Sequence, residues 1–155
     1  MGYVEKNLTS GEAVVYRAHL HRIIFVPAVL LALASLPLWY LVFSNKDLSI
    51  LGYAAGLLDV AAAVSLLSAL IAYKTSEFAV TNKQLIVKVG FVSRRSVELL
   101  LPKVEGIGVD QDFWGRILGY GTIIVTGTGG TKEPFAKIAS PLEFRRQVNE
   151  QITRG

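Results

Sequence analysis

Two long apolar tracts, joined by the six residues SNKDLS, constrain this chain more than any other feature of its sequence. The first tract runs from Ile23 to Phe43 without a charge, and the second runs from Ile50 to Tyr73 with a single charge at Asp59. A helix of about 21 residues rises roughly 31 Å, which matches a hydrocarbon core of about 30 Å. Because the connecting segment is short, the tracts predict an antiparallel pair of membrane-spanning helices.

The charges that flank the tracts predict an orientation. Arg17 and Arg22 precede the first tract and Lys74 follows the second, whereas the connecting segment has Lys46 as its only cation. An excess of Lys and Arg marks the cytoplasmic side of a membrane protein. We therefore expect both termini in the cytoplasm. The first tract is too long for the apolar core of a signal peptide, and it starts too far from the N-terminus.

Asp59 lies near the middle of the second tract, where an acidic side chain costs roughly 2.5 to 3.5 kcal/mol. Antiparallel pairing would bring it close to Ser35, whose hydroxyl can hydrogen-bond a carboxyl group. Gly52 and Gly56 form a GxxxG spacing beside it, and small residues let helices approach closely. We expect these four residues to pack helices, within the hairpin or between protomers. The alternative is a proton or ion pathway that uses Asp59.

From Lys74 onward apolar and polar residues alternate, as they do in strands with one buried face. The alternation predicts strands over residues 78–80, 85–89, 93–101, 104–109, 122–126 and 131–138. Ser140 and Glu143 have the spacing of a capping box, with a helix to about Thr153 behind it. This helix has one apolar stripe, formed by Phe144, Val148 and Ile152. The predicted fold class is a membrane α-helical hairpin plus an all-β barrel of the pleckstrin-homology-like (PH-like) plan, closed by a C-terminal α-helix.

The segment over residues 78–130 resembles the bacterial PH-like domain of small membrane proteins. The resemblance rests on the following elements: Thr81 after the first strand, Gly90 before a basic turn with Arg94, Leu101-Pro102, Val109-Asp110-Gln111, and the run from Arg116 to Gly121. It implies a PH-like fold behind a two-helix hairpin in the bacterial inner (cytoplasmic) membrane, and it implies no activity, because fold alone does not fix function. We expect a cytoplasmic N-terminal segment over 1–22, a hairpin over 23–73 with helices at 23–43 and 50–73, and a cytoplasmic PH-like domain over 74–155.

The composition argues against catalysis. The chain has no cysteine, and its two histidines, His19 and His21, precede the first apolar tract without a third metal ligand nearby in the sequence. The glycine-rich stretch over 127–130 lacks the downstream Lys-Ser/Thr pair of a phosphate-binding loop and joins two predicted strands. The net charge of +4 is dispersed, which does not suit a nucleic-acid-binding surface. We expect a protein that is not an enzyme and has no metal or cofactor.

Two groups of residues are candidate contacts. Lys88, Arg94 and Arg95 would lie near the membrane and contact anionic lipid, where each cation contributes up to about 1 kcal/mol. The alternative is an ordinary solvated face. The candidate protein contact is formed by Phe113, Trp114 and Arg116. Its alternative is that both aromatic rings plug the mouth of the barrel.

The sequence thus leaves three functions open. The preferred one is homo-oligomeric assembly or docking of another membrane-associated protein, helped by exposed sheet edges in the apolar segments 84–92 and 122–126. The second is an anionic lipid head-group sensor that uses the basic hairpin. The third is a small transport or proton-handling subunit that uses Asp59. The expected partners are membrane lipids and proteins, and not nucleic acid.

Overall fold

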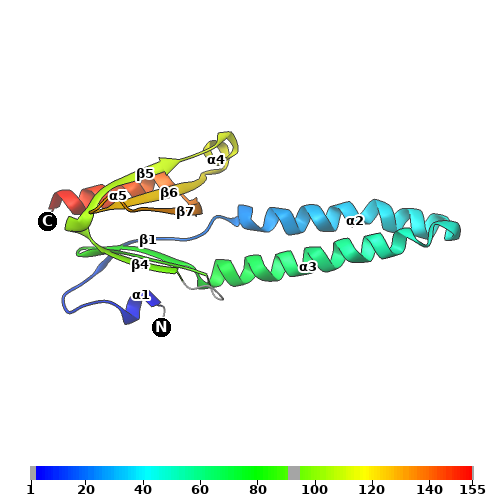
Figure 1. Cartoon of the computed structure of the whole chain (residues 1–155), viewed down its shortest axis with the longest axis horizontal. Coiled ribbons are helices and arrows are strands. Elements are labelled where there is room, and N and C mark those ends of the chain that lie inside the picture. Colours follow the sequence, from blue (N-terminus) through cyan, green and yellow to red (C-terminus); the bar gives the residue numbers. More distant parts are fainter. Residues whose placement is uncertain (1–2, 91–94, 155) are drawn as a thin grey trace. The chain divides into compact units, whose positions relative to one another are not determined.

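The computed structural model describes residues 3–90 and 95–154, and the chain forms two compact units. Residues 22–74 form a helical unit, and residues 1–21 join residues 75–155 in a strand-rich unit (Figure 1). The N-terminal segment, which we expected to be separate, is therefore part of the strand-rich unit.

The helical unit consists of two long helices with short 3-10 turns. A 3-10 turn over Arg22–Phe25 leads into α2 (Val26–Ser44), and a second over Lys46–Leu48 leads into α3 (Leu51–Thr75). Both helices are long and apolar enough to cross a membrane by length and composition. In their most apolar windows only 11% and 17% of the residues are buried. The core helices of a soluble protein are mostly buried, so these two helices do not resemble them.

Small residues line the contact between α2 and α3. The register of the two antiparallel helices follows from the indole of Trp39, which donates to Asp59 at 2.9 Å, and from the rings of Phe25 and Tyr73, whose centroids are 5.7 Å apart. The buried small residues recur at intervals of seven, namely Ala28 and Ser35 on α2 and Ala55, Ala62 and Ala69 on α3. This repeat is typical of a left-handed helix pair, in which small side chains permit a close approach.

The first sheet has four antiparallel strands, and its edge strand comes from the N-terminal segment. The order is β1-β2-β3-β4, from Val14–Ala18, Glu77–Thr81, Gln84–Val89 and Arg95–Leu100. Strand β1 pairs with β2 although the whole helical unit lies between them in the sequence. Sequence analysis missed this strand, because a local pattern carries no information about so distant a pairing.

The short helix α1 (Tyr3–Lys6) covers the outer face of this sheet. Val4 is buried there against Ala79 and Ile86, and the backbone N–H groups of Tyr3 and Val4 donate to the carboxylate of Glu77 at 2.9 and 3.0 Å. Strands β2 and β3 are consequently buried on both faces. The prediction of strands with one buried face was wrong for these two.

The second sheet has three antiparallel strands in the order β5-β6-β7, from Val104–Asp110, Tyr120–Gly127 and Lys132–Ala139. A 3-10 turn over Leu101–Lys103 joins it to the first sheet, and the short helix α4 (Phe113–Leu118) connects β5 to β6. Burial alternates along β6, and its inward residues Ile123 and Val125 are fully buried. The predicted strand at 122–126 is therefore central, as its β-branched composition indicates.

The two sheets do not close into a barrel, so the prediction of a closed barrel was wrong. Each sheet has its own hydrogen-bonding ladder, and an isolated bridge between Leu20 and Ile138 links them at one side. On the other side the chain turns through Leu101–Lys103 instead of continuing β4 into β5 as one ladder. Two antiparallel sheets with a C-terminal helix are still consistent with a PH-like fold.

The C-terminal helix α5 (Pro141–Arg154) packs on strands of both sheets and fills the core between them. Phe144 and Val148 of the predicted stripe are fully buried, and Ile152 is half-buried. The predicted capping box does not form. Ser140 has a positive φ of 50°, and its N–H donates to the carbonyl of Gly119 instead of to Glu143.

Candidate functional site

The helix α4 is a short, well-defined element between two strands. Its first turn is capped by the carboxylate of Asp112, which accepts a hydrogen bond from the N–H of Gly115. Its last turn ends at Gly119, which has a φ of 77° and donates its N–H to the carbonyl of Gly115 at 2.8 Å. Both ends therefore have the hydrogen bonds that a helix of six residues lacks by itself.

Gly115 fixes α4 against the domain. A β-carbon at this position would lie 2.5 Å from the carbonyl oxygen of Tyr120 and 2.6 Å from the carboxylate of Asp112. The side-chain amide of Gln111 donates to the carbonyl oxygens of Gly115 and Tyr120 at 3.2 and 2.8 Å. The glycine side of α4 is thus held against the start of β6.

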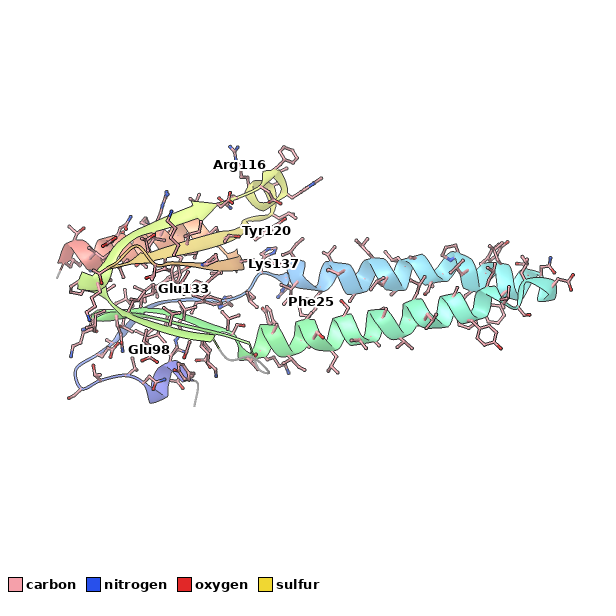
Figure 2. The ribbon with its side chains drawn as sticks, in the orientation of Figure 1. Phe25, Glu98, Arg116, Tyr120, Glu133 and Lys137 are labelled. Carbon is pink, nitrogen blue, oxygen red and sulfur yellow. The ribbon has the colours of Figure 1, made fainter. Side chains whose placement is uncertain are left out.

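The opposite side of α4 is apolar and faces outward. Four large side chains are exposed there by about half or more, namely Phe113 (69%), Trp114 (62%), Ile117 (61%) and Leu118 (46%). We call these four residues the α4 apolar face. The interpretation that Phe113 and Trp114 plug a barrel mouth is therefore wrong. Arg116 is also exposed and points away from the sheet (Figure 2).

The predicted basic contacts are only partly described. Arg94 lies outside the described residues, and of Arg95 only the backbone is placed, opposite Val89 in the β3–β4 ladder. The amine of Lys88 lies 4.8 Å from the centre of the Tyr3 ring, a cation–π contact. Lys88 is half-buried and pairs across the ladder with Glu77.

The predicted sheet edges lie elsewhere. Strand β3, which contains the apolar segment from Gln84, lies between β2 and β4, and β6 lies between β5 and β7. A central strand is hydrogen-bonded to a neighbouring strand on each side, so neither β3 nor β6 offers a free edge to another chain. The prediction of edges in these two segments was wrong, and the edge strands of the described sheets are β1, β4, β5 and β7.

A groove of about 500 Å³ lies where the β2–β3 turn, the end of β4 and the last turn of α5 meet. It is lined by Asn82, Lys83, Leu100, Leu101, Pro102, Gln151 and Ile152, and we call it the Leu100 groove. Leu100 is 49% exposed there, whereas Leu101 is buried at its floor. The amine of Lys83 is engaged by the carbonyl of Ser10 at 2.9 Å. The sequence signal for this groove was the Leu-Leu-Pro step, which we interpreted as the end of a strand and as a mark of the family resemblance, and not as a binding site.

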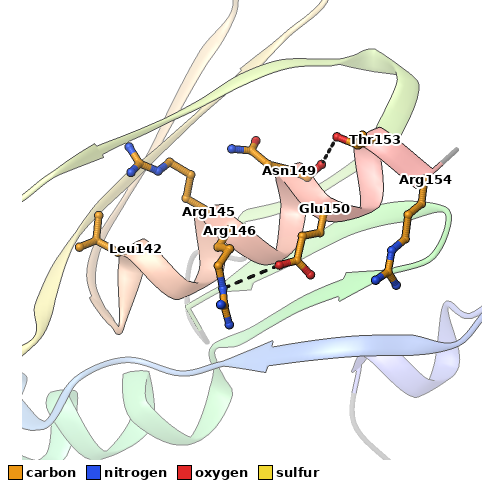
Figure 3. A pocket seen from close by; sticks show the side chains of 7 residues that line it. All are labelled: Leu142, Arg145, Arg146, Asn149, Glu150, Thr153 and Arg154. Carbon is orange, nitrogen blue, oxygen red and sulfur yellow. Dashed lines mark hydrogen bonds and ion pairs between the residues drawn. The ribbon is translucent and has the colours of Figure 1, made fainter.

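A second hollow, of about 640 Å³, lies along the outer face of α5 (Figure 3). All seven residues that line it belong to this one helix, from Leu142 to Arg154. Arg146 is paired there with Glu143 at 2.8 Å and with Glu150 at 3.8 Å. The hollow is therefore part of a solvated helix surface, and we assign it no function.

In the helical unit the structure brings Ser35 and Asp59 together, and it places one of the two glycines, Gly52, against α2. The Trp39 indole donates to the carboxylate of Asp59 at 2.9 Å. Ser35 lies close to the same carboxylate, and its hydroxyl donates to the carbonyl of Ala32 at 2.9 Å. Gly52 lies against Val42 of α2, at 3.9 Å from an ideal β-carbon, but Gly56 has open space beside it. Of the GxxxG pair, Gly52 therefore takes part in the contact between α2 and α3, and Gly56 does not.

A buried polar cluster at the β2–β3 turn was missed by sequence analysis. The hydroxyl of Thr81 lies 2.6 Å from the carboxylate of Glu12 and accepts the N–H groups of Lys83 and Gln84. Partial burial alone would raise the pKa of Glu12, but hydrogen bonds from Thr81, Thr9 and Gln84 outweigh it and hold the pKa below its ordinary value. The cluster ties the N-terminal segment to the turn.

Comparison with known protein families identifies one family. A family model described as the bacterial PH domain matches residues 20–152, which is most of the chain. A search of the curated proteins finds no match. One solved structure that is similar is a DUF1696 family protein with a pleckstrin-homology domain from Shewanella loihica PV-4, with 8% identity and a TM-score of 0.46 over 96% of this chain and 89% of that chain. Given the extent of the family match, the chain belongs to the bacterial PH domain family.

Proposed function

We propose that this protein is a non-enzymatic, membrane-anchored docking protein. In this account α2 and α3 span the bacterial inner membrane with both termini in the cytoplasm, and the PH-like domain docks a protein through the Leu100 groove. The partner is a second copy of the chain or another membrane-associated protein. The observation that carries the proposal is the position of the groove, at the end of the domain opposite to the residues that connect it to the helical unit.

The anchoring is supported by the surface of the helical unit. Large apolar side chains are exposed along both helices, among them Leu33, Leu36, Val60 and Leu67, each by more than half. Apolar surface on this scale is unfavourable in water, where burial contributes about 25 cal/mol per Å². A lipid environment removes this cost.

The position of the groove within the domain follows from the strands of the first sheet. The chain leaves the domain after His21 and returns at Thr75, and Ala18 pairs with Phe78 beside these points. We call this the attachment end. Strand β2 runs away from it and finishes at Thr81, next to Asn82 of the groove. The groove is thus separated from the attachment end by the length of the sheet.

The groove suits an apolar protein segment. Its exposed lining combines Leu100 and Pro102 with the half-buried Ile152, and a volume of about 500 Å³ can hold a few side chains. Strand β4, which ends at Leu100, is an edge strand, so a partner strand can pair with it next to the groove.

The test is native mass spectrometry of the full-length protein extracted in mild detergent. We expect a defined assembly with protein subunits, and we expect Leu100→Glu to dissociate it because a buried charge opposes apolar docking. The matched control is Leu142→Glu, since Leu142 is 52% exposed and lies ten residues from Ile152 along α5. A monomeric wild-type protein, or an assembly that survives Leu100→Glu, would overturn the proposal.

A second candidate is the head-group sensor, which is favoured by the position of Lys88. Lys88 pairs with Glu77, so the end of β3 and the start of β4 lie at the attachment end of the domain. Reversing the charges at Lys88, Arg94 and Arg95 together should then reduce the binding of anionic lipid to the full-length protein. Unchanged lipid retention would exclude this candidate.

A further inference from the structure

We infer that the α4 apolar face inserts into the interface of the same bilayer that α2 and α3 cross, at the boundary of head groups and acyl chains. Its partner is lipid and not a protein. The inference rests on the membrane anchoring proposed above, and it is independent of the Leu100 groove.

The face is an organised surface and not a set of scattered side chains. Its residues follow each other at i, i+1, i+4 and i+5, which places them on one side of a helix. Phe113 and Trp114 form an edge-to-face pair with centroids 5.5 Å apart. On the other side Gly115 is buried against the domain, so that α4 presents the four side chains on a fixed support.

The position of α4 within the domain selects the bilayer as the partner. Tyr120, which begins β6 directly after α4, has its ring 5.4 Å from the ring of His21. The N–H of His21 donates to the carbonyl of Lys137 at 2.7 Å, and Leu20 forms a bridge with Ile138. His21 is followed directly by Arg22, where the helical unit begins. The base of α4 is therefore held at the attachment end of the domain.

The chemistry of α4 also fits an interface. Tryptophan and other amphipathic rings concentrate at membrane–water boundaries, and apolar faces of interfacial helices enter them by about 5–10 Å. The charges close to this face largely balance. Arg116 and Lys137 are exposed, as are Asp110 and Asp112, and Asp112 is already engaged as the helix cap. The contact is thus mainly apolar, and it should form on zwitterionic lipid without any anionic lipid.

The chain contains no cysteine, so a single label can test this inference in the full-length protein. Ile117→Cys carries an environment-sensitive fluorophore, and the protein is reconstituted into phosphatidylcholine vesicles with or without spin-labelled lipid. We expect a blue-shifted emission and about a twofold loss of intensity with spin-labelled lipid, because the label lies within the depth that interfacial helices reach. With the additional changes Phe113→Ser and Trp114→Ser, spin-labelled lipid should quench the fluorescence much less.

The matched control is the same label at Val15→Cys, which is 43% exposed on β1 near Thr81, away from the attachment end. It should show neither the shift nor the quenching. Emission typical of a water-exposed label at position 117 would overturn the inference. A blue-shifted emission that the spin-labelled lipid does not quench would also overturn it, because it would show that a protein covers α4. Failure of the protein to float with the vesicles would instead contradict the anchoring itself.

Discussion

Gly115 is the residue on which the geometry of α4 depends. We predict that Gly115→Ala lowers the free energy of unfolding by about 1 to 3 kcal/mol, because its methyl group would overlap the carbonyl oxygen of Tyr120. Thermal unfolding of the detergent-solubilised protein measures this as a drop of several degrees in Tm. The control is Gly106→Ala in β5, where a β-carbon meets nothing within 4 Å. Equal effects of the two substitutions would contradict the account of α4.

The stability of the domain depends on pH through the carboxylate of Glu12. Its carboxylate is stabilised by hydrogen bonds in the folded state, so its pKa lies below the ordinary value of 4.5, despite a partial burial that opposes this. A lowered pKa means that the stabilisation is complete above pH 4.5 and is lost as the pH falls through the folded-state pKa. We predict that Tm falls in acid, and that Glu12→Gln flattens this part of the Tm–pH curve. An unchanged curve would show that Glu12 does not contribute.

The sequence predicts individual residues where their partners are local. The cap of α4 is predictable in this way, although we did not predict it, because Asp112 precedes the helix by one residue and accepts from Gly115 three residues later. The Ser140 and Glu143 pair has equally good spacing, but the close contact of Ser140 with Gly119 puts its backbone in another conformation. Glu12 and Thr81 are 69 residues apart, so local patterns cannot connect them.

At the scale of elements, β1 is required for the domain to fold. We predict that residues 74–155 alone do not fold, since β2 would lose its outer neighbour and Phe144 would lose its ring contact with Tyr16. Residues 1–21 joined by a short Gly-Ser linker to residues 76–155 should fold, because the two chain ends lie side by side. Circular dichroism and proton NMR distinguish the two cases. A folded 74–155 fragment would contradict this role of β1.

The pairing of α2 and α3 gives a second prediction at this scale. Ala62 is 8% exposed in the contact of the helices, so Ala62→Leu should force them apart at a cost of about 1 to 3 kcal/mol. Ala61 is the neighbouring residue and is exposed, so Ala61→Leu should have little effect. Loss of helical circular dichroism on heating in detergent compares the two variants. A larger effect at Ala61 would show that the register is wrong.

Elements with a strong local pattern are predictable from the sequence, and elements whose environment is made by distant residues are not. The apolar tracts, the strand around Ile123 and the stripe of α5 were all predicted near their positions in the structure. The double burial of β3 was not, because the cover comes from Val4 at the other end of the chain. The outward direction of Phe113 and Trp114 follows from Gly115 and Gln111, whose contacts depend on the arrangement of β5 and β6.

At the scale of the whole molecule, the claim that most needs a direct test is the anchoring of the docking domain by a hairpin that spans the bilayer. Two variants each carry a single cysteine, one in place of Asp47 between the helices and one in place of Thr128 in the β6–β7 turn, and both positions are exposed. A membrane-impermeant maleimide is applied to intact cells and to inverted membrane vesicles. The account predicts that Asp47→Cys is labelled only from the outside and Thr128→Cys only in inverted vesicles. Labelling of both positions from the same side, or release of the protein from membranes by alkaline carbonate, would contradict it.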